Sequence, residues 1–119
     1  MATKFARING KLTNPSVSIA AATTTTIATP SSGKRLHVLG LLLVPAASMT
    51  VQPVFGSTAQ TGVMTIAAPL FLPPSVVDAA GGCCAVPLWT GAVDEAFKLT
   101  TAAATQLSGY VLLMEDDPT

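Results

Sequence analysis

Few side chains in this sequence could carry out chemistry, and its single histidine is the first to consider. His37 stands between Arg35 and Leu39 in an apolar stretch, and no carboxylate is close to it in the sequence. A facial metal triad or a Ser-His-Asp arrangement needs a histidine grouped with carboxylates. We therefore expect His37 to be a partly buried or interface side chain, and neither a catalytic base nor a metal ligand.

Asp94-Glu95 is the only adjacent pair of carboxylates in the interior of the sequence. Successive residues of a strand point to opposite faces, so these two groups cannot converge as the acid and base of a glycosidase. The Gly81-Gly82-Cys83 sequence lacks the Lys-Ser/Thr partner of a phosphate-binding loop. Neither pattern predicts an enzyme.

The two cysteines, Cys83 and Cys84, are adjacent in the sequence. Adjacent cysteines have poor geometry for a mutual disulfide, and two thiols are too few for a structural zinc site. We interpret them as small hydrophobic residues, buried or at an edge. The sequence therefore predicts a protein without cofactor or metal.

The composition points to assembly. Only 10% of the 119 residues are charged, and half are hydrophobic, against about 25% charged residues in typical soluble domains. A single domain of this size cannot hide so much apolar surface alone, so we expect neighbouring subunits to cover part of it. The formal net charge of zero argues against a nucleic-acid partner.

The longest apolar run is Leu36–Val44, which ends at Pro45. It is far shorter than the about 20 residues of a transmembrane helix, so no membrane partner is expected. The N-terminal sequence MATKFARINGK has no continuous apolar segment of the kind found in a secretory signal. We therefore expect synthesis in the cytoplasm.

Short apolar segments separated by glycine and proline predict an all-β fold. The expected strands cover residues 17–28, 36–44, 48–55, 60–67, 70–72, 85–89, 95–101 and 106–114. Residues 75–80 suit either a helical turn or a loop. About eight short antiparallel strands at this spacing are typical of a sandwich or barrel, and in a double sheet they would form a jelly roll.

Two of these strands have informative patterns. In 36–44 both faces are mostly apolar, which predicts a central strand covered on both sides. One face is expected to carry Leu36, Val38, Leu42 and Val44, and the other Leu39, Leu41 and Leu43. In 95–101, Phe97 and Leu99 are expected to point inward, with Lys98 and Thr100 outward. Pro53 should lie at a sheet edge or in a bulge.

The ends of the chain differ from its middle. Residues 1–14 are polar and basic and are expected to form an extended N-terminal arm, residues 15–114 the β-sandwich domain, and residues 115–119 an acidic C-terminal tail. The arm would become ordered on a partner. The alternative is that both ends are solvated tails.

Several segments together resemble a known group of proteins. They are Gly33–Leu39, Thr50–Ser57, Thr61–Met64, Glu95–Leu99 and Leu107–Tyr110. In this order they resemble tailed-bacteriophage capsid cement, or decoration, proteins of the jelly-roll type, over residues 17–114. Residues 69–85 depart from that pattern, since they are richer in proline and contain the cysteine pair.

The resemblance implies a virion protein on the capsid surface. Such a protein has no catalytic residues, docks between neighbouring major capsid subunits and clamps them after the shell expands. The implied partners are the major capsid protein and copies of the chain itself, as a dimer or trimer. The residues expected to contact partners are Phe5, Arg7, Ile8 and Lys11 in the arm and Glu115, Asp116 and Asp117 in the tail.

Two other functions remain open at this point. A receptor- or glycan-binding β-module of a tail fibre would need an exposed aromatic or polar site, for which Trp89 and Tyr110 are the few candidates. A head-tail joining or tail-tube subunit would need a long insertion loop, and residues 69–82 are the only contender.

Overall fold

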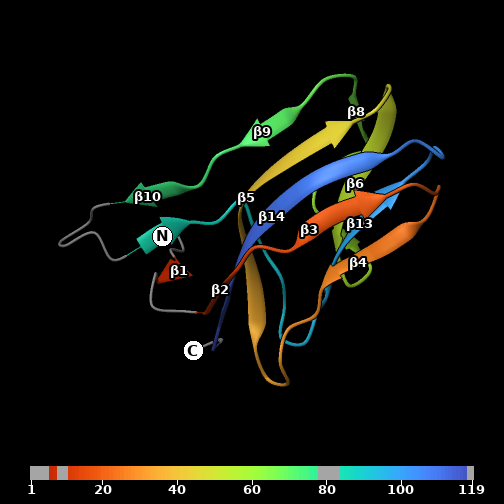
Figure 1. The fold of residues 1–119 in the computed structure, drawn as a ribbon. Helices are drawn as coiled ribbons and strands as arrows, with labels where there is room; N and C mark the ends of the chain where they lie inside the picture. The colour runs from red at the N-terminus through yellow and green to blue at the C-terminus, as the bar shows by residue number, and fades with distance from the viewer. Residues whose placement is uncertain (1–5, 8–10, 78–83, 118–119) are drawn as a thin grey trace.

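The computed structural model describes residues 6–7, 11–77 and 84–117, and all regular elements in these ranges are β-strands (Figure 1). The strands are β1 (Ala6–Arg7), β2 (Lys11–Thr13), β3 (Ser16–Ile19), β4 (Thr24–Ala28), β5 (Arg35–Pro45), β6 (Met49–Phe55), β7 (Thr58–Ala59), β8 (Met64–Ile66), β9 (Leu70–Leu72), β10 (Ser75–Val77), β11 (Cys84–Val86), β12 (Trp89–Thr90), β13 (Phe97–Thr101) and β14 (Leu107–Asp116). The predicted all-β class is confirmed.

Two antiparallel sheets pack face to face as a sandwich (Figure 1). The β5–β14 sheet has the order β12-β5-β14-β2, with β9 also on β5 and β3 also on β14. The β6–β13 sheet has the order β4-β13-β6-β7, with β8 also on β6. The chain passes from one of these sheets to the other between β3 and β4, β4 and β5, β5 and β6, β8 and β9, β12 and β13, and β13 and β14. Strands distant in sequence therefore become neighbours.

A small third sheet interrupts the path between β9 and β12. Its order is β1-β11-β10, and Figure 1 draws it beside the sandwich, near the N label. Residues 75–77, expected to form a helical turn or loop, are strand β10, so that prediction is wrong for them. The β-branched Val76 and Val77 favour a strand, and both have register partners in β11.

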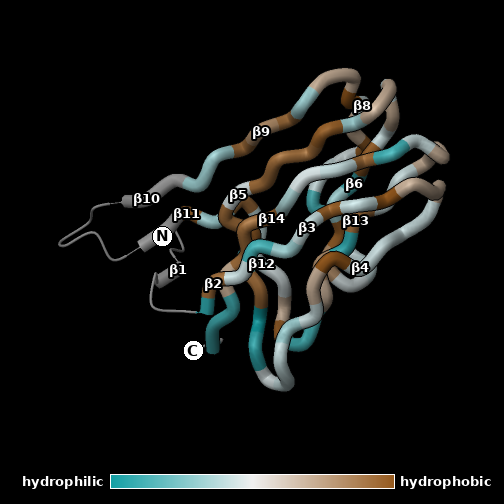
Figure 2. Tube along the Cα trace, viewed as in Figure 1, coloured by the Kyte–Doolittle hydropathy of each residue, from teal (hydrophilic) through white to brown (hydrophobic). Residues whose placement is uncertain are grey.

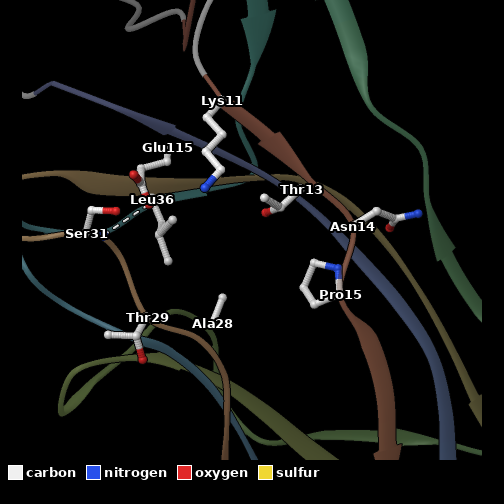
Figure 3. A pocket seen from close by; sticks show the side chains of 9 residues that line it. All are labelled: Lys11, Thr13, Asn14, Pro15, Ala28, Thr29, Ser31, Leu36 and Glu115. Atoms are coloured by element: carbon white, nitrogen blue, oxygen red, sulfur yellow. Dashed lines mark hydrogen bonds between the residues drawn. The ribbon is translucent and has the colours of Figure 1, made fainter.

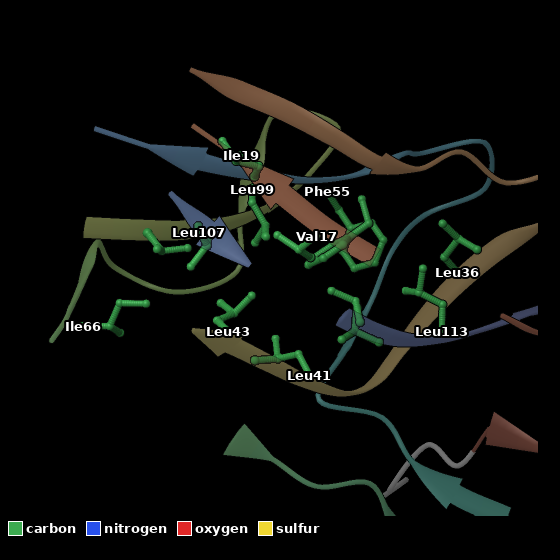
Figure 4. Close-up of a cluster of buried hydrophobic side chains, with 14 of the residues drawn as sticks. Val17, Ile19, Leu36, Leu41, Leu43, Phe55, Ile66, Leu99, Leu107 and Leu113 are labelled. Atoms are coloured by element: carbon green, nitrogen blue, oxygen red, sulfur yellow. The ribbon is translucent and has the colours of Figure 1, made fainter. Parts of the chain in front are cut away.

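The core lies between the two sheets (Figure 4). Its largest fully buried side chains include Phe55, Phe97, Leu41, Leu43 and Leu99. The rings of Phe55 and Phe97 lie 5.1 Å apart between centroids, a distance typical of favourable aromatic pairs. The alternation predicted for the β13 segment is confirmed, because Phe97 and Leu99 are buried while Lys98 and Thr100 are partly exposed.

Strand β5 is a central strand, as its sequence indicates, with β14 on one edge and β12 and β9 on the other. The predicted alternation of its side chains is wrong beyond Leu39. Val38 pairs with Leu113 and Gly40 pairs with Leu112, so Leu39 is an extra residue that forms a bulge. After it, Leu41 and Leu43 enter the core and Leu42 turns outward.

Pro53, expected at a sheet edge or in a bulge, lies in neither, because its pairing with β13 has no register shift. Strand β6 is an inner strand, with β13 on one side and β7 and β8 on the other. The carbonyl of Pro53 accepts a hydrogen bond of 2.9 Å from the backbone N–H of Gln60. The N and C=O of one strand residue point toward the same neighbouring strand. The nitrogen of Pro53, which has no hydrogen to donate, therefore faces the interval between β7 and β8.

Several of the expected strands have different bounds in the structure, and the expected strand 85–89 is divided between β11 and β12, which lie in different sheets. Residues 17–28 form two strands, since residues 20–23 carry the chain from one sheet to the other. In the expected strand 60–67, only Met64–Ile66 is paired. Strand β14 continues through Asp116 because Glu115 and Asp116 still pair with the start of β5.

Parts of the expected arm and tail belong to the sheets. Lys11–Thr13 forms β2, which pairs with residues 113–115 of β14. Ala6–Arg7 forms β1, which pairs with β11. Sheet pairing therefore extends beyond residues 15–114 on both sides.

Candidate functional site at the charged end of the sandwich

The antiparallel pairing of β5 with β14 brings basic and acidic residues together at one end of the sandwich. Lys34 Nζ lies 2.6 Å from Asp117 Oδ1, and Arg35 Nε lies 3.0 Å from Asp116 Oδ1. The hydrogen bond to Asp117 and the nearby carboxylates raise the pKa of Lys34. Figure 2 shows hydrophilic residues along this end, next to the C-terminus. We refer to it as the charged end.

His37 lies beside these pairs and is buried, with 3% of its surface exposed. Its Nε2 is 2.9 Å from Asp116 Oδ1, and its Nδ1 is 2.9 Å from Thr90 Oγ1 on β12. Burial is the main reason that the pKa of His37 is lowered from 6.5; Asp116 opposes this effect and Arg35 adds to it. A neutral ring fits both contacts, with Nε2–H donating to Asp116 and Nδ1 accepting from the Thr90 hydroxyl.

The structure confirms that His37 is buried, and it gives the ring a partner that the sequence does not show. The ring is buried, as expected. A carboxylate is nevertheless in contact with it, because the register of β14 on β5 places Asp116 there across 79 positions of sequence. No local sequence signal could have shown this contact.

Thr90, His37 and Asp116 place a hydroxyl, an imidazole and a carboxylate in a row, which resembles the catalytic groups of acyl-transfer enzymes. Acyl transfer needs free donors aimed at a developing oxyanion. The backbone N–H groups of Leu88 and Gly91, on either side of β12, already donate to Val38 and Leu36 at 2.7 and 2.9 Å. The hydrogen bonds of His37 to Thr90 and Asp116 join β12, β5 and β14 to one another.

The carboxylates of the charged end also hold its turns. Glu115 Oε1 accepts a 3.1 Å hydrogen bond from the Ser31 N–H, and Asp94 Oδ1 accepts one of 2.7 Å from the Gly33 N–H. Glu95 Oε1 accepts a 2.9 Å bond from the Ala92 N–H. Asp94 and Glu95 precede β13 and bind different turns. These acidic groups position backbone segments at the surface.

An open hollow of about 520 Å³ lies beside the network (Figure 3). It is lined by Lys11, Thr13, Asn14, Pro15, Ala28, Thr29, Ser31, Leu36 and Glu115. Lys11 and Glu115 are direct cross-strand partners on β2 and β14, so one charge of each sign borders the hollow. The hollow thus combines one charge of each sign with hydroxyl and apolar groups.

The residues predicted to contact partners fall into three groups. Lys11, Glu115, Asp116 and Asp117 come together at the charged end. The backbone of Arg7 pairs with Cys84 in the small sheet. Phe5 and Ile8 lie outside the described residues, as does Cys83.

Sequence reasoning did not predict that Lys34, Arg35, His37 and Thr90 take part in the side-chain contacts of the charged end. The basic pair Lys34-Arg35 stands at the start of an apolar strand and indicates that this end of the strand lies at the surface. Its pairing with the C-terminal carboxylates depends on which strands become neighbours, and the sequence alone does not show this.

Within residues 6–7, 11–77 and 84–117, no group of three or more His, Cys, Asp or Glu side chains could hold a metal ion. In the same ranges, no helix is long and apolar enough to cross a membrane. Comparison of the chain with protein families, curated proteins and solved structures found no match.

Proposed function

We propose that this chain is a structural virion protein that binds the outside of a phage capsid and stabilises the contacts between major capsid subunits. The observation that carries the proposal is the strand order, β3-β14-β5-β9 in one sheet and β4-β13-β6-β8 in the other. Eight strands in two such sheets, with the chain crossing between them, fit a jelly roll. The sequence resemblance is to capsid cement proteins of that fold.

The charged end is the surface proposed to meet the capsid. It offers Lys11, Lys34 and Arg35 next to three consecutive carboxylates, 115–117. The Lys34–Asp117 pair is solvent-accessible, with 37% and 65% of the two side chains exposed. Exposed pairs of this kind contribute little to folding, so they can exchange partners at small cost when a neighbour brings its own charges.

The chain would hold capsid subunits together through the surface area that it buries on them, without a covalent or catalytic step. A specific interface buries about 1,600 Å² in total, and a clamp must share that area between two capsid subunits. The N-terminal residues Phe5, Arg7 and Ile8 would extend the contact beyond the charged end. The proposal assigns no catalytic step and no cofactor.

The test uses the purified full chain and empty shells assembled from the major capsid protein encoded in the same genome. The chain should sediment with expanded shells and not with unexpanded ones. A variant that lacks residues 1–10 keeps β2 and should bind expanded shells more weakly. If its affinity is unchanged, the N-terminal arm does not take part in the contact with the shell. Binding to cells or glycans without any affinity for shells would contradict the proposal and favour a tail-fibre module.

A further inference from the structure

Strand β4 forms one edge of the β6–β13 sheet (Figure 1). Among the described strands it pairs only with β13, so its other side is unpaired there, and we refer to that side as the β4 edge. With five residues, β4 is the longest described strand at any edge of the two large sheets. Such an edge presents main-chain N–H and C=O groups to which another extended chain can pair.

The hydrogen bonds between β13 and the start of β4 show which main-chain groups point away from the sheet. The N–H of Thr101 donates to the C=O of Thr23 at 2.8 Å, and the N–H of Thr23 donates to Thr101 Oγ1 at 3.4 Å. Successive strand residues direct these groups to opposite sides, so Thr24 and Thr26 direct theirs away from β13. Both residues are exposed, so two donors and two acceptors are accessible at the β4 edge.

The sequence does not protect the β4 edge as it protects several others. Natural edge strands are commonly blocked by a charged residue or a proline. Strand β2 begins at Lys11, and β9 lies between Pro69 and Pro73. Residues 20–29, which include β4, contain neither a charge nor a proline. Four of them are consecutive threonines, which favour extended backbone. The β4 edge is therefore suited to accept a further strand.

The hollow beside the charged end adjoins the β4 edge. Ala28, the last residue of β4, and Thr29 line it on one side, and Asn14 and Pro15 lie across from them (Figure 3). Leu36, which belongs to the core, also lines it, so the hollow opens between the two sheets. The two charges at its border are of opposite sign. A strand added to β4 would therefore pass the mouth of a hollow suited to an uncharged side chain.

We propose that the β4 edge and the adjoining hollow bind an extended segment of a partner polypeptide, which adds to the β6–β13 sheet as an antiparallel strand. Main-chain hydrogen bonds to Thr24 and Thr26 hold the segment, and one of its uncharged side chains enters the hollow. The groups that the edge offers are those of a strand ladder. They select an extended peptide over a compact apolar surface.

The strand already paired with β4 indicates what sequence the segment needs. Lys98 and Thr100 of β13 lie opposite Thr26 and Thr24, and the apolar neighbours of Lys98 and Thr100 in β13 are buried. Directly opposed residues of antiparallel strands share a face of the sheet. A segment on the β4 edge therefore also needs alternating polar and apolar residues, with its apolar side chains on the side of the hollow.

The probe is the synthetic peptide acetyl-Ala-Phe-Lys-Leu-Thr-Thr-amide, which copies residues 96–101. In an NMR titration of the isotope-labelled full chain, it should shift the amide signals of Thr24 and Thr26 most. We expect a Kd of about 1 mM or below, because the ordering of a short peptide opposes binding. Thr26→Pro removes one edge donor and leaves the pairing with β13 intact, since this N–H points away from β13. It should weaken binding at least about tenfold.

Two N-methylated forms of the peptide are the matched controls. Methyl groups on the nitrogens of its lysine and its first threonine remove the hydrogens that would be donated to β4, so this form should not bind. Methyl groups on the nitrogens of its phenylalanine and leucine point away from β4 and should leave the affinity nearly unchanged. The two forms have the same side chains, so a difference between them reports main-chain pairing.

A peptide that does not bind the wild type, or that binds Thr26→Pro equally well, would overturn the proposal, as would equal affinities of the two N-methylated forms. If Thr26→Pro does not fold, as judged by circular dichroism, Thr24→Pro serves in its place. Dimers of the full chain that dissociate on the Thr26→Pro substitution, measured by sedimentation equilibrium, would assign the edge to a second copy and also overturn the proposal. The inference does not rest on the capsid proposal, since the titration contains no shells.

Discussion

The Nε2 atom of His37 lies 2.9 Å from Oδ1 of Asp116, and the same oxygen accepts a hydrogen bond from Arg35 Nε at 3.0 Å. One carboxylate therefore links two side chains at the start of β5 to the end of β14. Strand β12 joins through Thr90, which contacts the other ring nitrogen. The charged end is thus held by a connected set of side chains, and its charge state should affect stability.

Acid should destabilise the protein through His37. The pKa of this ring is lowered in the folded state, mainly by burial, so below about pH 6.5 the unfolded chain binds more protons than the folded chain. Stability is complete above that pH and is lost as the pH falls toward the lower folded-state pKa. Urea unfolding at a series of pH values checks this.

The His37→Gln variant provides the control for acid sensitivity. It removes the titrating ring and keeps a polar side chain, so its stability should fall less steeply between neutral and mildly acidic pH than that of the wild type. Identical pH profiles for the two proteins would mean that His37 is not the group responsible.

Asp116→Asn should destabilise the fold by about 1–3 kcal/mol, because Arg35 and His37 would lose a charged acceptor. Asp117→Asn is the matched comparison, since Asp117 is 65% exposed in its pair with Lys34, and it should change the unfolding free energy little. Denaturant unfolding at neutral pH measures both. Equal effects of the two variants would argue against the central position of Asp116.

Gly109→Ala tests the close packing of β14 on β5. Gly109 has a φ of +140°, and a Cβ there would lie 1.8 Å from the Leu42 carbonyl oxygen. The backbone would have to move, so we expect a loss of about 2 kcal/mol or more. Gly62→Ala is the control, because no atom lies within 4 Å of its added Cβ. Thermal unfolding should separate the two variants clearly.

The sequence was most informative where one face of a strand is apolar and the other polar. Phe97 and Leu99 alternate with Lys98 and Thr100, and both the strand and its orientation could be predicted from them. In β5 both faces are apolar, so the pattern gave the central position of the strand but contained no signal for the bulge at Leu39. The outward position of Leu42 followed from that bulge.

The charged end was only partly predictable for a different reason. The sequence placed Lys11 and the acidic residues 115–117 at the ends of the chain and gave them a common role in binding. Their contacts depend on β14 pairing with both β2 and β5. Such pairings join segments about 80–100 residues apart, and short-range pattern carries no information about them.

The pair formed by Lys11 and Glu115 allows folding to be separated from binding. The two residues are opposite each other on β2 and β14 and border the same hollow. Lys11→Glu alone places two like charges opposite each other, which should cost about 0.2–1 kcal/mol. The double variant Lys11→Glu with Glu115→Lys restores opposite charges within the chain but reverses the charge that each position presents to a neighbour.

We therefore expect the double variant to regain the stability that Lys11→Glu loses through like-charge repulsion, without the hydrogen bond of Glu115 to the Ser31 N–H, and still to bind expanded shells more weakly. Thermal unfolding and shell co-sedimentation at low and moderate salt measure the two effects separately. The loss of binding should diminish as salt screens the charges, because surface electrostatics are weakened beyond about 10 Å at 0.1 M salt. If the double variant recovers shell binding together with stability, this pair only supports the fold, and the capsid contact lies elsewhere on the molecule.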